Sequence, residues 1–333
     1  MELELLIFQC KGKGAGKISF RGRKFSITFV PGFTDRGECS KEVNALDCSE
    51  NLITCISSFP SFFIHINCNN NILEALPRLS ENLVVLHCSE NNLEFLPELP
   101  KTLVELKCSS NKLKSLPKLP IAMEKLVCNK NPIEKISSSS PSLVLLSCSE
   151  CELKEIPAFP NLQTLDVSDN PITKIENLSS TVLYFYCSYT DIKTLKGLPD
   201  TLEKLECNYN SLEKEIKDLP LSLEVLNFVG NGVEKLYLPP KVKEVICTEN
   251  PLKFIEPLPV RPSPYIYPRT NVISRLHLKR FYKSYYQRYK VKKYVISLLS
   301  LPPVECVPKV IYTVSTVLDF VFFWKPTKGK KQK

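Results

Sequence analysis

The stretch LVELKCSSNKLKSLPKLP, Leu103 to Pro120, carries the pattern L-x-x-L-x-C-x-x-N-x-L-x-x-L-P-x-L-P in full. The same pattern recurs at intervals of about 20 residues through eleven units, and its cysteine position is the easiest column to follow. That column is formed by Cys48, Cys68, Cys88, Cys108, Cys128, Cys148, Val167, Cys187, Cys207, Phe228 and Cys247. The positions two before and five after it are apolar in every unit, and the position three after it is Asn in all units except those of Cys151 and Thr190. Four aligned columns over eleven units identify a repeat protein.

With its L-P-x-L-P return, the pattern resembles the short form of the leucine-rich repeat, similar to repeats in secreted effectors of enteric bacteria and in proteins of large DNA viruses of protists. The resemblance covers roughly residues 40 to 260. It departs locally, because Ser137 and Glu176 replace the return proline and residues 214–217 contain a one-residue insertion. The resemblance implies an α/β repeat class, with a solenoid of about 11 coils and a parallel β-sheet on the concave face. It implies no particular function, because such repeats bind many unrelated partners.

Elementary geometry agrees with this fold. The alternation x-L-x-C-x points Leu and Cys to one face, as a short strand requires. The Asn column turns the chain and satisfies backbone groups that a tight coil would bury. Twenty residues leave no room for an ordinary helix, so the Pro-rich return is predicted to be polyproline II or a 3₁₀ turn, and the solenoid to curve gently.

Three segments follow from the pattern. Residues 1–40 are predicted to form an N-terminal β cap, in which Lys17 to Val30 reads as a hairpin around Gly22. Residues 41–260 form the leucine-rich-repeat solenoid. Residues 261–333 form a basic, aromatic C-terminal extension with a helical pattern.

Composition describes two chemically different parts. The chain has 333 residues, 43% hydrophobic and 24% charged, which is a globular composition. Residues 261–333 hold 16 of the 44 Lys and Arg but only two acids, Glu305 and Asp319. The remaining residues hold 28 bases and 33 acids. The chain therefore divides by charge into an acidic body and a basic tail.

The cysteine pattern indicates a structural role in the core and no metal, redox or catalytic role. Nine of the 14 stand in the inward column, and no second C-x-x-C accompanies Cys148 and Cys151 to complete a zinc site. Cys151 falls on the Asn column, which favours a structural role. Free thiols predict an intracellular reducing compartment or a virion, and the acidic start MELELLIFQC lacks a secretory signal. His65 and His87 on adjacent strands leave a metal pair as a minor alternative.

The solvent face of the sheet is the best candidate surface for a protein partner, because the strands fix its outward positions. Its middle is aromatic, and clustered exposed aromatics are typical interface anchors. The candidates at outward positions of nearby strands are Leu145, Tyr184, Tyr186, Tyr189 and Tyr209. An alternative is that these aromatics pack only on one another.

The tail is the other candidate. Residues 275–294 place tyrosines on one helical stripe among many bases. The basic residues are Arg275, Lys279, Arg280, Lys283, Arg288, Lys290, Lys292 and Lys293. These bases suit binding to an acidic protein surface, to nucleic acid or to an acidic membrane surface. The alternative is that the tyrosine stripe only packs against the last coil as a cap. Residues 310–324 are apolar, but a helix of that length is shorter than the roughly 20 residues of a membrane crossing, so a strand, a helix or a membrane-associated segment are the alternatives there.

These features predict a non-enzymatic protein-protein interaction scaffold that binds a protein on its sheet face, anchors by its tail, and needs no cofactor or small-molecule substrate. A minor capsid component of a large DNA virus is the narrower version. An effector-type adaptor or ubiquitin ligase is the alternative, although only residues 261–333, with Cys306, follow the repeats. Nucleic-acid or membrane-surface binding through the tail is another.

Overall fold

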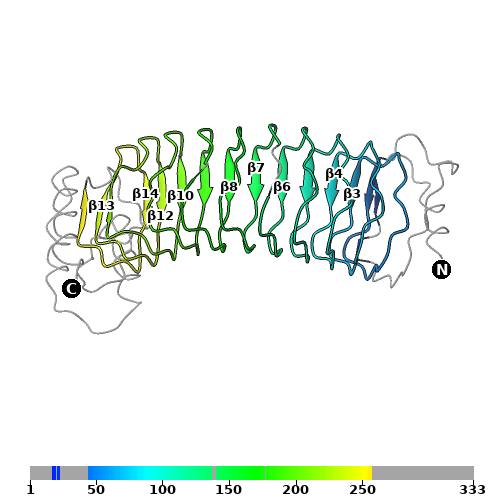
Figure 1. Ribbon diagram of the computed structural model, residues 1–333, viewed down its shortest axis with the longest axis horizontal. Helices are drawn as coiled ribbons and strands as arrows, with labels where there is room; N and C mark the ends of the chain where they lie inside the picture. The colour runs from blue at the N-terminus through cyan, green and yellow to red at the C-terminus, as the bar shows by residue number, and fades with distance from the viewer. Residues whose placement is uncertain (1–16, 20, 23–43, 137–139, 177, 257–333) are drawn as a thin grey trace, which may run out of the picture.

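Most of the described residues belong to stacked coils, and each coil contributes one short strand to a parallel sheet. The computed structural model describes residues 17–19, 21–22, 44–136, 140–176 and 178–256. Twelve strands form one parallel sheet in the order β1-β2-β3-β4-β5-β6-β7-β8-β9-β10-β12-β14, side by side along the long axis in Figure 1. Eleven of them come from the eleven predicted repeats, so the solenoid and its coil number are confirmed.

All strands are short. They are β1 (Lys17–Ser19), β2 (Ala45–Asp47), β3 (His65–Asn67), β4 (Val85–His87), β5 (Glu105–Lys107), β6 (Lys125–Val127), β7 (Leu145–Ser147), β8 (Thr164–Asp166), β9 (Tyr184–Tyr186), β10 (Lys204–Glu206), β11 (Glu215–Ile216), β12 (Val225–Asn227), β13 (Lys235–Tyr237), β14 (Glu244–Ile246) and β15 (Phe254–Glu256). Neighbours pair without slippage, as in Leu86↔Leu106 and Leu106↔Leu126. The repeat period therefore fixes the register.

The core is one continuous column inside the coils. The central strand residue Leu106 and the following Cys108 are both fully buried, as are their equivalents in most coils. Cysteine suits this position because it is small and carries only a weak donor. The prediction that the cysteine column faces inward is confirmed.

The asparagines form a ladder that binds each coil to the one before it. The Asn111 Nδ2 donates to the carbonyls of Cys88 in the preceding coil and of Cys108 in its own, both at 3.0 Å. Its Oδ1 accepts from the N–H of Leu93 at 3.0 Å. Amide side chains can do this because they carry both donors and an acceptor. Buried backbone groups of two coils are thereby paired at each step.

Where Asn is absent, the ladder adapts. Cys151 offers only long sulfur contacts, 3.5 Å to the Cys128 carbonyl and 3.6 Å to that of Ser149. In the coil before it, the Ile133 N–H donates instead to the Asn131 carbonyl of its own coil at 2.7 Å. This bond closes a three-residue turn. The backbone itself therefore replaces the missing side-chain acceptor.

The second proline of the return begins a β-turn that leads into the next strand. The carbonyl of Pro100 accepts from the N–H of Leu103 at 3.1 Å, which closes a β-turn just before the next strand. Equivalent turns start at Pro60, Pro120, Pro199, Pro220 and Pro239, and at Ser80, Ser140 and Ser179.

The i→i+3 bonds of these turns have the hydrogen-bond pattern of the predicted 3₁₀ turn. The return side also has one feature that was not predicted. In the last coils it forms a second parallel sheet, β11-β13-β15. There Lys217, Tyr237 and Glu256 stand where the regular repeat has its first return proline. A residue with an N–H permits ladder bonds that proline forbids.

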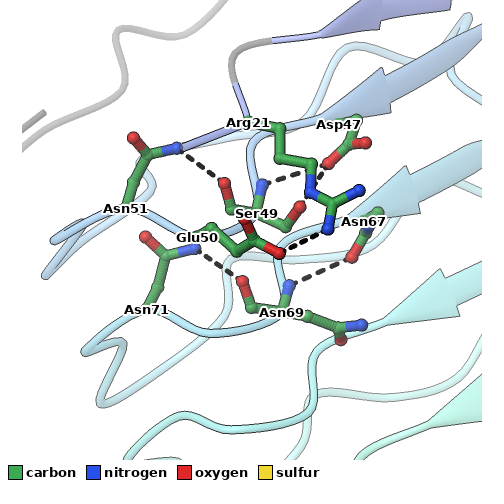
Figure 2. A network of polar contacts seen from close by, with 8 residues as sticks. All are labelled: Arg21, Asp47, Ser49, Glu50, Asn51, Asn67, Asn69 and Asn71. Atoms are coloured by element: carbon green, nitrogen blue, oxygen red, sulfur yellow. Dashed lines mark hydrogen bonds and ion pairs between the residues drawn. The ribbon is translucent and has the colours of Figure 1, made fainter. Parts of the chain in front are cut away.

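The N-terminal segment extends the ladder. β1, from the predicted cap, pairs in parallel with β2, with Ile18 opposite Leu46. Gly22 has φ 66°, the left-handed conformation that Glu50 adopts in the next coil, and its N–H donates to the Ser49 carbonyl at 3.1 Å. Arg21 reaches Glu50 at 2.6 Å (Figure 2). The second run of the predicted hairpin around Gly22 lies outside the described residues, so the hairpin stays a prediction.

The C-terminal extension, residues 261–333, also lies outside the described residues, so its predicted helix stays a prediction. In the part of the chain that is described, no helix is long and apolar enough to span a membrane.

Candidate interaction surface

The outward side chains of the strands form the sheet face, two rows that run the length of the solenoid. One row holds the first residue of each strand, from Ala45 on β2 to Glu244 on β14, and the other holds the third residue. Parallel strands lie about 4.8 Å apart. The sheet face therefore presents an ordered array whose spacing the backbone fixes.

Glu105 organises the N-terminal half of the sheet face. Its carboxylate lies 2.9 Å from His87 Nε2, 2.9 Å from Lys107 Nζ and 3.7 Å from Lys125 Nζ. Partial burial opposes ionisation, but the bonds from Lys107 and His87 outweigh it and lower the pKa of Glu105 to about 2. His87 is thus held by a carboxylate. The described residues contain no group of three or more His, Cys, Asp or Glu that could hold a metal.

Tyr184 and Tyr186 stand on β9, at the centre of the C-terminal half. Tyr184 is 36% exposed and its hydroxyl donates to Glu203 at 3.3 Å. Lys204 Nζ lies 5.1 Å from the centre of the Tyr186 ring and 2.8 Å from Glu206. A cation over an aromatic face is attracted by the ring quadrupole. These contacts restrain the side chains in the free protein, and a side chain that is already restrained loses less entropy on binding.

Tyr189 and Tyr209 do not lie on the strands, where they were predicted. They occupy the turns after β9 and β10, with φ 53° and 50°. This left-handed conformation is uncommon for bulky residues. Their rings stack at 4.7 Å with 16° between planes. They remain 54% and 40% exposed.

Gly230 makes room for this pair. A Cβ at Gly230 would lie 2.4 Å from Cδ1 of Tyr209, and Gly230 has φ 66° in the equivalent turn position. Beyond it, the Tyr209 hydroxyl donates to Glu249 at 3.2 Å. Sequence reasoning missed the role of Gly230. The signal was present, since it stands two residues after Phe228, where other coils carry a side chain.

Leu145 lies apart from the tyrosines. It is half-buried on β7 and pairs in register with Thr164, which in turn pairs with Tyr184. One strand therefore separates it from β9. The basic residues of the tail, from Arg275 to Lys293, lie outside the described residues.

The thiols of the core offer no nucleophile. Burial raises the pKa of Cys48 and of Cys247 to about 12, and raises that of Cys148 well above its usual value. A thiol with a raised pKa is a poor nucleophile at neutral pH. Cys148 and Cys151 are both free and buried. Their C-x-x-C spacing arises because the repeat places them in the core column and the ladder.

Comparisons with known proteins agree with the geometry. The family described as Leucine Rich repeats (2 copies) matches residues 141–180. No curated protein matches the sequence. YopM from Yersinia enterocolitica WA-314 is 29% identical with a TM-score of 0.65, over 70% of this chain and 51% of that one. The chain therefore spans about half the length of that protein.

Two further structures are similar. YopM from Yersinia pestis, described as a leucine-rich effector protein, is 25% identical with a TM-score of 0.54, over 73% of this chain and 80% of that one. The internalin InlF from Listeria monocytogenes has a TM-score of 0.54 over 72% of this chain and 79% of that one, but its 16% identity shows a shared fold only. Together with the eleven repeat columns and the asparagine ladder, these matches show that the chain has a leucine-rich repeat fold, and that it is similar to the two YopM structures.

Proposed function

We propose that this protein is a non-enzymatic scaffold that binds a protein partner on its sheet face. The observation that carries the proposal is the ordered, half-exposed aromatic and charged centre around Tyr184 and Tyr186. Exposed tyrosines held beside charged groups are typical of interface anchors. The resemblance to effector proteins supports a role in protein-protein interaction, and leaves the partner open.

The test is a photo-crosslinker, p-benzoylphenylalanine, placed at Tyr184 in the full chain and exposed to extract from the organism that produces it. Tyr237 on the return sheet is the matched control, since it is 37% exposed against 36% for Tyr184. We expect one discrete protein adduct from position 184, absent from position 237 and weakened by Tyr186→Ala. Identical adduct patterns from the two positions would refute a specific sheet-face site.

The narrower predictions, a capsid role and a tail that anchors to nucleic acid or a membrane, gain no support from the described residues and stay predictions. The effector-like repeats are compatible with an adaptor that selects a substrate. Thioester formation at Cys306, abolished by Cys306→Ala, would overturn the non-enzymatic proposal in favour of a ligase.

A further inference from the structure

The turns that follow the sheet strands form a continuous edge along the solenoid, and its C-terminal half has an unusual composition. The edge there consists of residues 147–152, 166–171, 186–191, 206–211, 227–232 and 246–251, which connect β7, β8, β9, β10, β12 and β14 to their returns. These six segments contain no Lys or Arg. Their acids are Glu150, Glu152, Asp166, Asp169, Asp191, Glu206 and Glu249. We call this surface the acidic edge.

Charge on the acidic edge is only partly compensated. Salt bridges from the neighbouring residues Lys130 and Lys204 reach Glu150 at 3.2 Å and Glu206 at 2.8 Å. Burial and the proximity of Glu150 and Asp166 raise the pKa of Asp169. Like charges close enough to perturb one another leave a negative potential that favours a cationic partner.

The stacked pair Tyr189 and Tyr209 stands in the middle of the acidic edge. The left-handed backbone of these two residues is shared by the equivalent turn position of every coil, from Glu50 to Glu249, and so belongs to the repeat. What sets the pair apart is that two aromatic rings stack there while Tyr189 and Tyr209 stay 54% and 40% exposed. An exposed aromatic face between carboxylates is the chemistry that captures arginine and lysine side chains.

We propose that the acidic edge, centred on Tyr189 and Tyr209, is the docking site for the chain's own basic segment, residues 275–294. Charge complementarity supports the choice of occupant, because this segment holds eight Lys and Arg and no acid. It also holds five tyrosines, which can stack on the exposed pair.

The connection is long enough. The Tyr209 turn follows β10, two strand spacings from β14, or about 10 Å along the sheet. Residues 257–274 separate the last described strand from Arg275, and an extended segment of that length reaches about 60 Å. A tether this short also keeps the local concentration of the segment high, which favours an intramolecular contact over one between two copies.

The test again uses p-benzoylphenylalanine, now at Tyr189 in the full chain at low concentration, with adducts mapped by peptide mass spectrometry. Tyr237 is the matched control, because it lies nearer to the tail in sequence, so tethering alone would favour it. We expect intramolecular adducts to residues 275–294 from position 189 only. Replacing Lys279, Arg280 and Lys283 together by Glu should lower the yield about fivefold or more, as should high salt.

Three outcomes would overturn the proposal: adducts that form only between two chains and rise with concentration, adducts that map elsewhere, and equal yields from positions 189 and 237. The variant Asp169→Asn with Asp191→Asn gives an independent reading, since it leaves the tyrosines intact. It should also lower the yield, and an unchanged yield would contradict a charge-based contact. The sheet-face proposal stands or falls separately, because its crosslinker is at Tyr184.

Discussion

Replacing Cys151 with asparagine should stabilise the protein. Cys151 is 8% exposed and occupies the ladder with two weak sulfur contacts, at 3.5 and 3.6 Å. On the pattern of Asn131 and Asn170, an asparagine there would donate to the carbonyls of Cys128, Cys148 and Ser149. Its Oδ1 would accept from the Ile133 N–H, which now bonds within its own coil.

The size of the effect follows from the bonds exchanged. Two or three ordinary hydrogen bonds replace weak ones, and each contributes about 0.5–1.5 kcal/mol net. Fixing the longer side chain costs on the order of 1 kcal/mol of entropy. The expected gain is therefore about 1–2 kcal/mol of unfolding free energy, or roughly 0.5 M in the urea midpoint.

Urea unfolding of the full chain under reducing conditions, followed by circular dichroism, measures this. The control is Cys148→Asn, the same chemical change three residues away. Cys148 is fully buried in the core column, so an amide there would lack hydrogen-bond partners and should lower the free energy of unfolding by about 2 kcal/mol or more. Opposite signs at 151 and 148 support the ladder account. A midpoint that falls in Cys151→Asn would refute it.

Three other changes test other parts of the structure. Gly230→Ala should destabilise the fold by about 2–4 kcal/mol, because residue 230 has a left-handed backbone and the new Cβ would lie 2.4 Å from the Tyr209 ring. In a double-mutant cycle of urea midpoints, Tyr209→Ala should relieve much of this loss. Glu105→Gln should lower the free energy of unfolding by about 1 kcal/mol at pH 7. Folding lowers the pKa of Glu105 from 4.5 to about 2, so the difference from the unmodified protein should persist above pH 4.5 and vanish as the pH approaches 2. A difference that does not depend on pH would contradict the charge cluster. Among the described cysteines, Cys55 is exposed while Cys48 is buried with a pKa raised to about 12, so iodoacetamide labelling read by peptide mass spectrometry should modify Cys55 first, and early labelling of Cys48 would count against the buried column.

The repeat columns were sufficient to predict the solenoid, its core and its ladder, because each column has a single physical role. An apolar residue must enter the core, and an asparagine must pair backbone groups. Cys151 is an example. Its C-x-x-C spacing to Cys148 suggests a metal or redox site, but its place in the asparagine column correctly predicted a buried structural role.

Features that depend on contacts between coils were harder to predict. The parallel pairing of β1 with β2 was not predicted, although residues 18–22 follow the alternation of a repeat strand and end in Gly22 at the left-handed position. The second sheet, β11-β13-β15, was not predicted. A return that lacks its first proline can pair as a strand but does not have to. Glu176 and Lys196 also replace the proline, and their returns form no strand.

The candidate surface was predicted in composition but not in geometry. Tyr184 and Tyr186 face outward on β9 as expected, because alternation along a strand determines orientation. Tyr189 and Tyr209 lie beyond the strand ends, where alternation no longer applies. No sequence rule for a single coil predicts that Gly230 seats a ring from the coil before it.

The second sheet has a mechanical consequence for the last three coils. In the described coils from β3 to β9, the return side forms no paired strands, so fewer backbone bonds oppose a change of spacing on that wall. Where β11, β13 and β15 pair, both walls are clamped at strand spacing. That section should resist bending, so that a load applied to the C-terminal end is transmitted to the more compliant coils before it.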